Sequence, residues 1–168
     1  MKVVFLDIDG VIATDATYKR WRQTSKREPF GAPLSELHGL IDPVLCDRVR
    51  FITEATGAVI VVSSSWRNMF DGAELCAFLG AYMPTPIGCT PERIPRGEAV
   101  QQWMEARDVA PADVVLLDDS DCAPMNGRRI QTPERTGIGA RHVARAVKLL
   151  GYRLSQSVTP ATAPGPTE

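Results

Sequence analysis

The stretch that decides the fold is VVFLDIDGV, residues 3–11, close to the start of the chain. Its first four residues form an unbroken apolar run, which is typical of a strand covered on both faces of a sheet. Asp7 and Asp9 follow the run, separated only by Ile8, and Gly10 comes next. An ordinary turn needs at most one Asp or Asn. The pair therefore indicates either chemistry at the end of a buried strand or an unusual turn.

Two later stretches repeat the pattern of an apolar run followed by polar side chains. Residues 58–62 run into Ser63 and Ser64, and residues 114–117 run into Asp118 and Asp119. Between and after these runs, capping residues and apolar spacing predict helices over 42–57, 71–79, 97–107 and 140–150, with a short last strand at 130–131. Alternating strands and helices predict a parallel α/β sheet. The polar groups should then meet at its carboxyl edge.

We expect one domain over residues 1–152, because 168 residues with 44% hydrophobic side chains suffice to bury a core. Residues 13–40 are polar and interrupted by Pro and Gly, so we expect them to leave the core as a small lid. Residues 153–168 are rich in Ser, Thr, Pro, Ala and Gly, a composition that predicts a disordered tail.

The bulk composition excludes several classes of function. A formal net charge of −1 gives no overall attraction to nucleic acid or membranes, so such binding needs a local patch. No apolar run approaches the roughly 18 residues of a membrane span, and the first residues lack a signal-peptide layout. The four cysteines are scattered without CxxC spacing. We expect a cytoplasmic monomer without a membrane partner.

Carboxylates that converge at one edge repel one another, and burying them unpaired is costly. A Mg²⁺ ion resolves this, since it takes carboxylates, waters and a phosphate oxygen. With the charge neutralised, Asp7 could attack phosphorus, and Asp9 could protonate the leaving group and later activate water. The hydroxyl of Ser63 could donate to phosphoryl oxygens, and a nearby cation would offset their charge.

These residues carry a resemblance to a known family. The segments FLDIDGV (5–11), VIVVSSSWR (59–67) and VVLLDDSD (114–121), in this order, resemble motifs of the haloacid dehalogenase-like (HAD) superfamily. TGAVIVVSSSWR (56–67), RGEAVQQWM (96–104) and LLDDSD (116–121) are more narrowly similar to small HAD domains of RNA-repair, phage and bacterial proteins. Polynucleotide phosphatases share the adjacent acid pair. The resemblance implies a Rossmann-like three-layer sandwich with a central parallel sheet and a minimal cap.

The resemblance also implies roles for individual residues. Asp7 would be the nucleophile that becomes phosphorylated, and Asp9 the acid and base, with its main-chain carbonyl on the metal. Ser63 would bind phosphate, with Ser64 as the alternative. The implied Mg²⁺ ligands are Asp7, Asp9, Asp118 and Asp119.

The chain departs from the family pattern at the third motif. That motif is usually a lysine, and no lysine lies between Lys26 and Lys148. Arg96 is the candidate replacement and Arg67 the second choice, because arginine is a permanent cation that can bind phosphate in a bidentate way. Which arginine fills the role stays open. The side chains and turns that we expect to contact the substrate are Gly10, Ser64, Arg67, Arg20 and Arg22.

Residues 18–27 form the one local basic cluster, with aromatic residues interleaved. The cluster could gather a phosphorylated or polyanionic substrate, and Tyr18 or Trp21 could stack on a base. Its alternative is a solvated flexible loop. A small lid leaves the site open, which would admit a large substrate such as an oligonucleotide end.

Other interpretations explain less of the sequence. A calcium loop that starts at Asp7 would need acids where Val11 and Tyr18 stand. Ser63–Ser65 could be a helix cap, and residues 118–121 an acidic loop. A dehalogenase needs no second acid, so Asp9 argues against it. The sequence therefore predicts a Mg²⁺-dependent phosphomonoester hydrolase acting on a nucleotide or nucleic-acid end. A small-metabolite phosphatase and a non-catalytic phosphate-binding module remain as alternatives.

Overall fold

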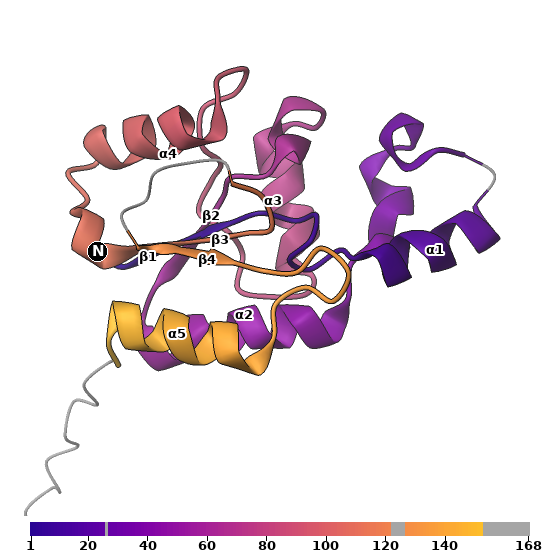
Figure 1. Cartoon of the computed structure of the whole chain (residues 1–168). Helices are drawn as coiled ribbons and strands as arrows, with labels where there is room; N and C mark the ends of the chain where they lie inside the picture. The colour runs from indigo at the N-terminus through magenta and orange to yellow at the C-terminus, as the bar shows by residue number, and fades with distance from the viewer. Residues whose placement is uncertain (26, 122–126, 153–168) are drawn as a thin grey trace, which may run out of the picture.

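The structure is a computed structural model that describes residues 1–25, 27–121 and 127–152. A four-stranded sheet lies at its centre, with strands β1 (Val3–Leu6), β2 (Val59–Val62), β3 (Val114–Asp118) and β4 (Arg129–Gln131). Their order is β2-β1-β3-β4, and all the pairings are parallel (Figure 1). The predicted parallel α/β sheet is confirmed. The expected tail, residues 153–168, and Cys122 lie outside the described residues.

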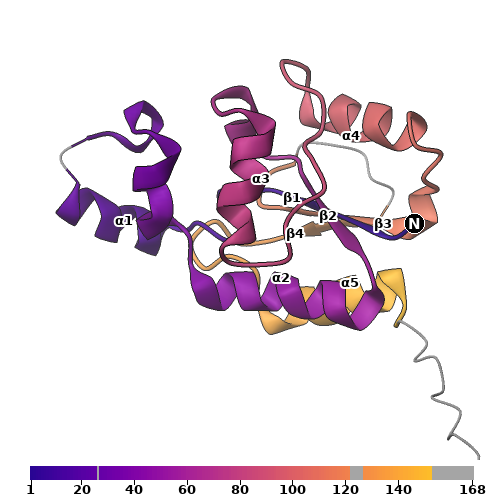
Figure 2. The ribbon, with the colours of Figure 1, turned by 180° about the vertical axis from the view of Figure 1, so that it is seen from behind.

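Helices cover both faces of the sheet, because alternate residues of the central strand point to opposite sides. Val4 and Leu6 belong to the apolar cluster that contains the buried faces of α2 (Pro43–Thr56) and α5 (Ala140–Leu150). Phe5 faces the other way, toward α4 (Arg96–Glu105), where the ring of Trp103 meets it edge to face at 5.4 Å. Figures 1 and 2 show the resulting three layers, with α2 and α5 side by side on one face and α4 on the other.

The helix boundaries follow the capping residues. Asp42 caps α2 by accepting from the main-chain N–H of Val44 at 2.9 Å, and Gly57 ends it in the left-handed conformation, with φ of 71°. Asp71 caps α3 (Gly72–Gly80) in the same way. Helix α4 begins at Arg96, one residue earlier than the sequence predicted. This start puts Arg96 in the first turn of a helix that packs directly on the sheet.

Residues 13–25 and 27–40 lie beyond the carboxyl edge of the sheet (Figures 1 and 2), and we call this segment the lid. The lid consists of α1 (Asp15–Thr24) and two 3-10 helices, Pro29–Gly31 and Leu34–Leu40. Trp21 is only 4% exposed, packs in the core and donates its indole N–H to the carbonyl of Glu36. The prediction that Trp21 stacks on a base is therefore wrong. The alternative of a flexible loop is also wrong for the part of the basic cluster that lies in α1.

The ends of the three long strands stay in register. The main-chain N–H of Asp7 donates to Leu117, and that of Ser63 donates to Leu6, at 3.0 and 2.9 Å. The pairing thus continues past β1 and β2, and it brings the residues that follow the apolar runs to one edge. In the part of the chain that the structure describes, no helix is long and apolar enough to cross a membrane.

The cap of α2 can be tested by removing the Asp42 carboxylate. Asp42→Ala should lower the free energy of unfolding by about 0.5–2 kcal/mol, because the first turn loses its acceptor. The matched control is Asp47→Ala in the same helix, whose carboxylate is 67% exposed and makes only a 3.7 Å ion pair with Arg50. That control should stay within about 0.5 kcal/mol of wild type in urea denaturation. Equal losses in both variants would contradict the capping role.

Candidate active site

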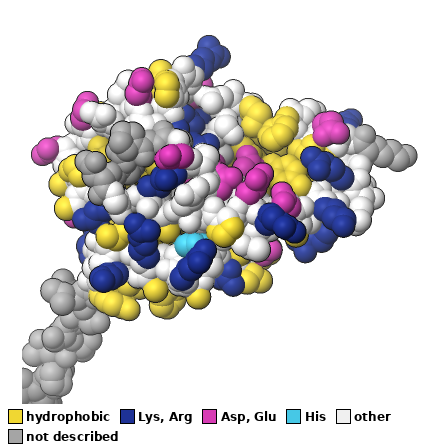
Figure 3. All heavy atoms as spheres, in the orientation of Figure 1, with side chains coloured by type: hydrophobic (Ala, Val, Ile, Leu, Met, Phe, Trp, Pro, Cys, Tyr) yellow, Lys and Arg dark blue, Asp and Glu magenta, His cyan; other side chains and the backbone are white. Residues whose placement is uncertain are grey.

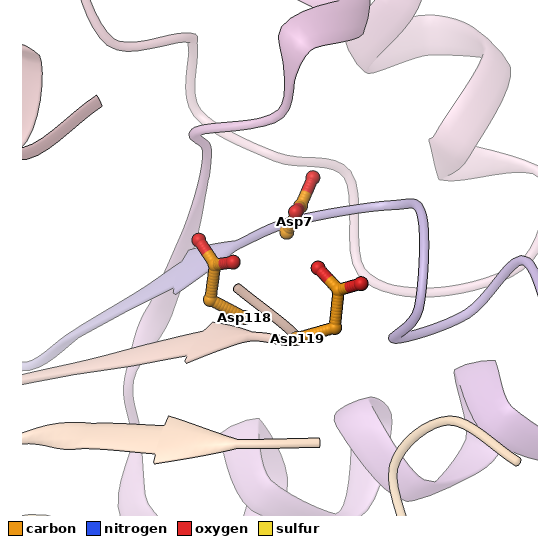
Figure 4. Close-up of side chains that lie close together, drawn as sticks. All are labelled: Asp7, Asp118 and Asp119. Carbon is orange, nitrogen blue, oxygen red and sulfur yellow. The ribbon is translucent and has the colours of Figure 1, made fainter. Parts of the chain in front are cut away.

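Three carboxylates meet at the carboxyl edge of the sheet. Asp7 follows β1, while Asp118 and Asp119 stand at the end of β3, and one oxygen of each lies within 4.8 Å of the others (Figure 4). Asp7 is 1% exposed and Asp118 is fully buried. Such a cluster is the expected result of placing acids after neighbouring parallel strands. We call it the carboxylate cluster.

Arg96 is the cation that contacts this cluster. Its Nη1 donates to Asp7 Oδ2 at 2.5 Å and also to Asp118 Oδ2. The other oxygen of Asp118 accepts from the main-chain N–H and the hydroxyl of Ser120, at 2.9 and 2.8 Å. The main-chain N–H of Ile8 donates to Asp7 Oδ1 at 2.8 Å. Both carboxylates are therefore held on two sides, and Arg96 joins them.

The cluster carries more negative charge than Arg96 neutralises. Burial raises the pKa of Asp7 to about 7; Arg96 opposes the rise and the neighbouring Asp118 adds to it. Burial and Asp118 also raise the pKa of Asp119. Three carboxylate oxygens at this spacing, with excess negative charge, suit a hard divalent cation such as Mg²⁺. Asp7, Asp118 and Asp119 fit the ion through their side chains.

The carboxylate of Asp9 lies outside this group and points to other partners. Asp9 Oδ1 accepts from the hydroxyl of Tyr18 at 2.6 Å, and Oδ2 accepts from the indole N–H of Trp66 at 3.0 Å. Burial, and then the charge of Asp9, raise the pKa of Tyr18, so its hydroxyl keeps its proton. The side chain of Asp9 thus does not join the carboxylate cluster, which leaves only its main-chain carbonyl for the predicted metal role.

The sequence did not reveal that Tyr18 and Trp66 hold Asp9. Trp66 is fully buried. A buried indole N–H needs an acceptor, and Trp66 lies just past the end of β2, beside a strand that ends in acids. That combination is the signal that could have identified it. Tyr18 stands in α1, and only the fold of the chain places its hydroxyl against Asp9.

Gly10 allows two loops of the site to approach closely. Its φ is +67°, and a Cβ at this position would lie 2.4 Å from the Cβ of Asp119. The carbonyl of Gly10 accepts from the hydroxyl of Thr132 at 2.7 Å. A side chain here would push Asp119 away from the carboxylate cluster. Gly10 therefore shapes the site through its backbone.

The two candidate serines have different surroundings. Ser64 hydrogen-bonds through its side chain to Asp7, which lowers the pKa of that carboxyl, and it accepts from the main-chain N–H of Trp66 at 3.3 Å. Ser63 is fully buried, and its hydroxyl has no hydrogen-bond partner among the described residues. The contact with Asp7 favours Ser64, the alternative of the two, as the phosphate ligand.

The expectation that Arg67 contacts the substrate needs correction. Arg67 is 3% exposed. Its guanidinium donates to four main-chain carbonyls, those of Ser63, Ser64, Pro91 and Ile94, at 2.9, 2.7, 3.0 and 3.4 Å. Arg67 therefore links the segment after β2 to the loop that leads into α4. Its guanidinium N–H groups donate to main-chain carbonyls.

A cavity of about 330 Å³ opens beside Asp9, between the sheet edge and the lid. We call it the lid cavity. Its lining residues are Asp9, Gly10, Ala13, Thr14, Asp15, Tyr18, Arg22, Phe30 and Glu134. Figure 3 shows acidic side chains gathered between the sheet and the lid, with Lys and Arg beside them on the lid. Of the two lid arginines expected to bind substrate, Arg22 lines this cavity, whereas Arg20 is exposed and does not.

A comparison with protein families matches most of the chain. The model of the HAD domain in Swiss Army Knife RNA repair proteins matches residues 3–143, which include the sheet, the lid and every residue of the carboxylate cluster. Neither the curated proteins nor the solved structures contain a match to the chain.

The raised pKa of Asp7 makes stability depend on pH in metal-free buffer. Between the ordinary value of 3.8 and about 7, folded Asp7 keeps a proton that the unfolded chain releases. The free energy of unfolding should therefore fall as pH rises from 4.5 to 7.5, and one unit of pKa shift corresponds to about 1.4 kcal/mol. Urea denaturation with EDTA should show a shallower fall in Asp7→Asn than in wild type. Identical slopes would contradict the raised pKa.

Proposed function

Because the chain belongs to the family of HAD domains found in Swiss Army Knife RNA repair proteins, we propose that it hydrolyses a phosphomonoester. The reaction uses Mg²⁺ and passes through an aspartyl-phosphate on Asp7. One observation carries the proposal: the buried carboxylate of Asp7 lies among Asp118, Asp119 and Arg96. A carboxylate can approach an anionic phosphorus only where cations offset the negative charge, and here Arg96 and a divalent cation bound by the three carboxylates would do so.

In the first step, an oxygen of Asp7 attacks phosphorus while the bond from phosphorus to the ester oxygen breaks. Asp9 donates its proton to that leaving oxygen, so the alcohol departs neutral. In the second step, Asp9 takes a proton from a water molecule whose oxygen attacks the phosphorus of the aspartyl-phosphate. The bond between phosphorus and Asp7 breaks, and inorganic phosphate and free Asp7 result. Asp7, Asp118 and Asp119 would hold a Mg²⁺ ion, which would supply charge neutralisation at the phosphoryl oxygens.

The surrounding residues have separate tasks in this scheme. Tyr18 and Trp66 fix the two oxygens of Asp9 toward the leaving group. Ser64, beside Asp7, donates to a phosphoryl oxygen, and Arg96 offsets the charge of the transferring group. Arg67 acts indirectly, because its hydrogen bonds to the carbonyls of Pro91 and Ile94 stabilise the loop before Arg96.

A nucleotide or a nucleic-acid end is the substrate class that the family description supports, since that description refers to RNA repair. Arg22 in the lid cavity is consistent with an anionic substrate. A small phosphorylated metabolite is the second candidate, because the lid cavity is the size of one small molecule rather than of a strand.

Phosphate release from a panel of phosphomonoesters tests the proposal. Wild type with Mg²⁺ should turn over at least one member among 3′- and 5′-phosphorylated oligonucleotides, mononucleotides, sugar phosphates and an aryl phosphate. EDTA should abolish turnover, and Asp7→Asn should lower kcat by at least about 10³-fold, because the amide is not a nucleophile. A folded, Mg²⁺-binding protein that releases no phosphate from any member would point to the non-catalytic phosphate-binding module.

Tyr18→Phe tests how Asp9 is held. Loss of one hydrogen bond to a carboxylate costs about 1.5–3 kcal/mol, so kcat should fall about 10-fold or more while Mg²⁺ affinity stays the same. The control is Tyr82→Phe, whose hydroxyl contacts His38 away from the site. An unchanged kcat in Tyr18→Phe would show that Tyr18 only packs.

A further inference from the structure

We propose that the lid cavity is the subsite for the leaving group, and that it takes a nucleoside whose base stacks on Phe30. This inference rests on the proposed function and narrows it. The cavity is lined by Asp9, the residue that would protonate the leaving oxygen, and by the backbone turn at Gly10. Whatever occupies the cavity is therefore attached to the oxygen that leaves.

The lid presents an aromatic surface to this space. Phe30 is 59% exposed although it is a large apolar side chain, and it lines the cavity. The ring of Tyr18 lies 6.5 Å from that of Phe30, tilted by 40°. The guanidinium of Arg22 stands 5.9 Å from the ring of Tyr18. A flat aromatic group gains most from such a surface, since base stacking on an aromatic side chain is favourable for every base.

The charges of the lining select against a second phosphate. Asp9, Asp15 and Glu134 contribute three carboxylates, and Arg22 contributes one guanidinium. Carboxylates accept hydrogen bonds from the hydroxyls of a ribose and from the amino groups of a base, whereas they repel another anion. A nucleoside diphosphate that is cleaved at its terminal phosphate would place its remaining phosphate in this lining. The cavity thus favours a monophosphate.

The size of the lid cavity agrees with one nucleoside. Its volume of about 330 Å³ is at the small end of ligand pockets, which span roughly 300–1,000 Å³. A ribose alone would leave the rings of Tyr18 and Phe30 uncovered. A free mononucleotide and a terminally phosphorylated oligonucleotide both present a nucleoside here, so the experiment includes both.

The experiment compares kcat/KM for adenosine monophosphate, adenosine diphosphate, ribose 5-phosphate, phosphocholine and a terminally phosphorylated oligonucleotide. Adenosine monophosphate should exceed ribose 5-phosphate and phosphocholine by at least about tenfold, the range of one stacking contact. Phe30→Ala should remove most of that preference. Phe51→Ala is the matched control, since Phe51 is a 54% exposed phenylalanine of α2 that does not line the lid cavity. It should leave the preference intact.

A second variant tests the charge of the lining. Adenosine diphosphate should be turned over at least about tenfold less well than the monophosphate, and Glu134→Gln should narrow that gap. The ratio of oligonucleotide to mononucleotide turnover identifies which source supplies the nucleoside. Equal turnover of ribose 5-phosphate and adenosine monophosphate would overturn the inference. So would a preference for phosphocholine, or equal effects of Phe30→Ala and Phe51→Ala.

Binding of adenosine, measured by calorimetry, separates this inference from the proposed function. Phe30→Ala should weaken adenosine binding about tenfold or more, whether or not any phosphomonoester is hydrolysed. Asp7-dependent hydrolysis of an aryl phosphate, without adenosine binding, would keep the phosphatase and overturn the subsite. Adenosine binding that depends on Phe30, without hydrolysis of any phosphomonoester, would keep the subsite and overturn the phosphatase.

Discussion

Repulsion among buried carboxylates is the constraint on which the site depends. Asp7, Asp118 and Asp119 bring three acids to the edge of a parallel sheet, and the guanidinium of Arg96 contacts two of them. Folding places these charges together because the apolar strands before them must pair in register. The core therefore stabilises a cluster that electrostatics opposes, and the raised pKa of Asp7 expresses that conflict. A divalent cation bound by these carboxylates would relieve it.

Much of the framework follows from local patterns. Unbroken apolar runs followed by acids or serines predicted the parallel strands. The rule that sites lie at the carboxyl ends of parallel strands predicted that Asp7, Asp118 and Asp119 lie close together. The absence of a lysine at the third motif made Arg96 the candidate cation, and Arg96 does contact the carboxylate cluster. In each case the information lies in a few neighbouring residues or in a general rule of sheet topology, so a single sequence suffices.

The errors arose where tertiary contacts decide. Arginine can donate to a main-chain carbonyl as well as to a phosphate, so composition could not show that Arg67 binds the backbone. Whether Ser63 or Ser64 faces Asp7 depends on how the chain leaves β2, which the apolar run does not encode. The lid has aromatic residues on more than one face, and only its packing shows that Trp21 is buried while Tyr18 reaches Asp9.

The contacts of Arg67 have a consequence for how loss-of-function variants are interpreted. In a screen that scores only lost activity, substitutions at Arg67 and at Arg96 would look alike, and both would be taken for phosphate ligands. Substitution of Arg67 would lower activity by destabilising the fold, because its guanidinium joins the end of β2 to the loop before α4. Even lysine would not replace it, since one ammonium cannot reproduce a planar fork that serves four carbonyls. A genetic map of this site therefore needs a measure of folded protein beside every measure of activity.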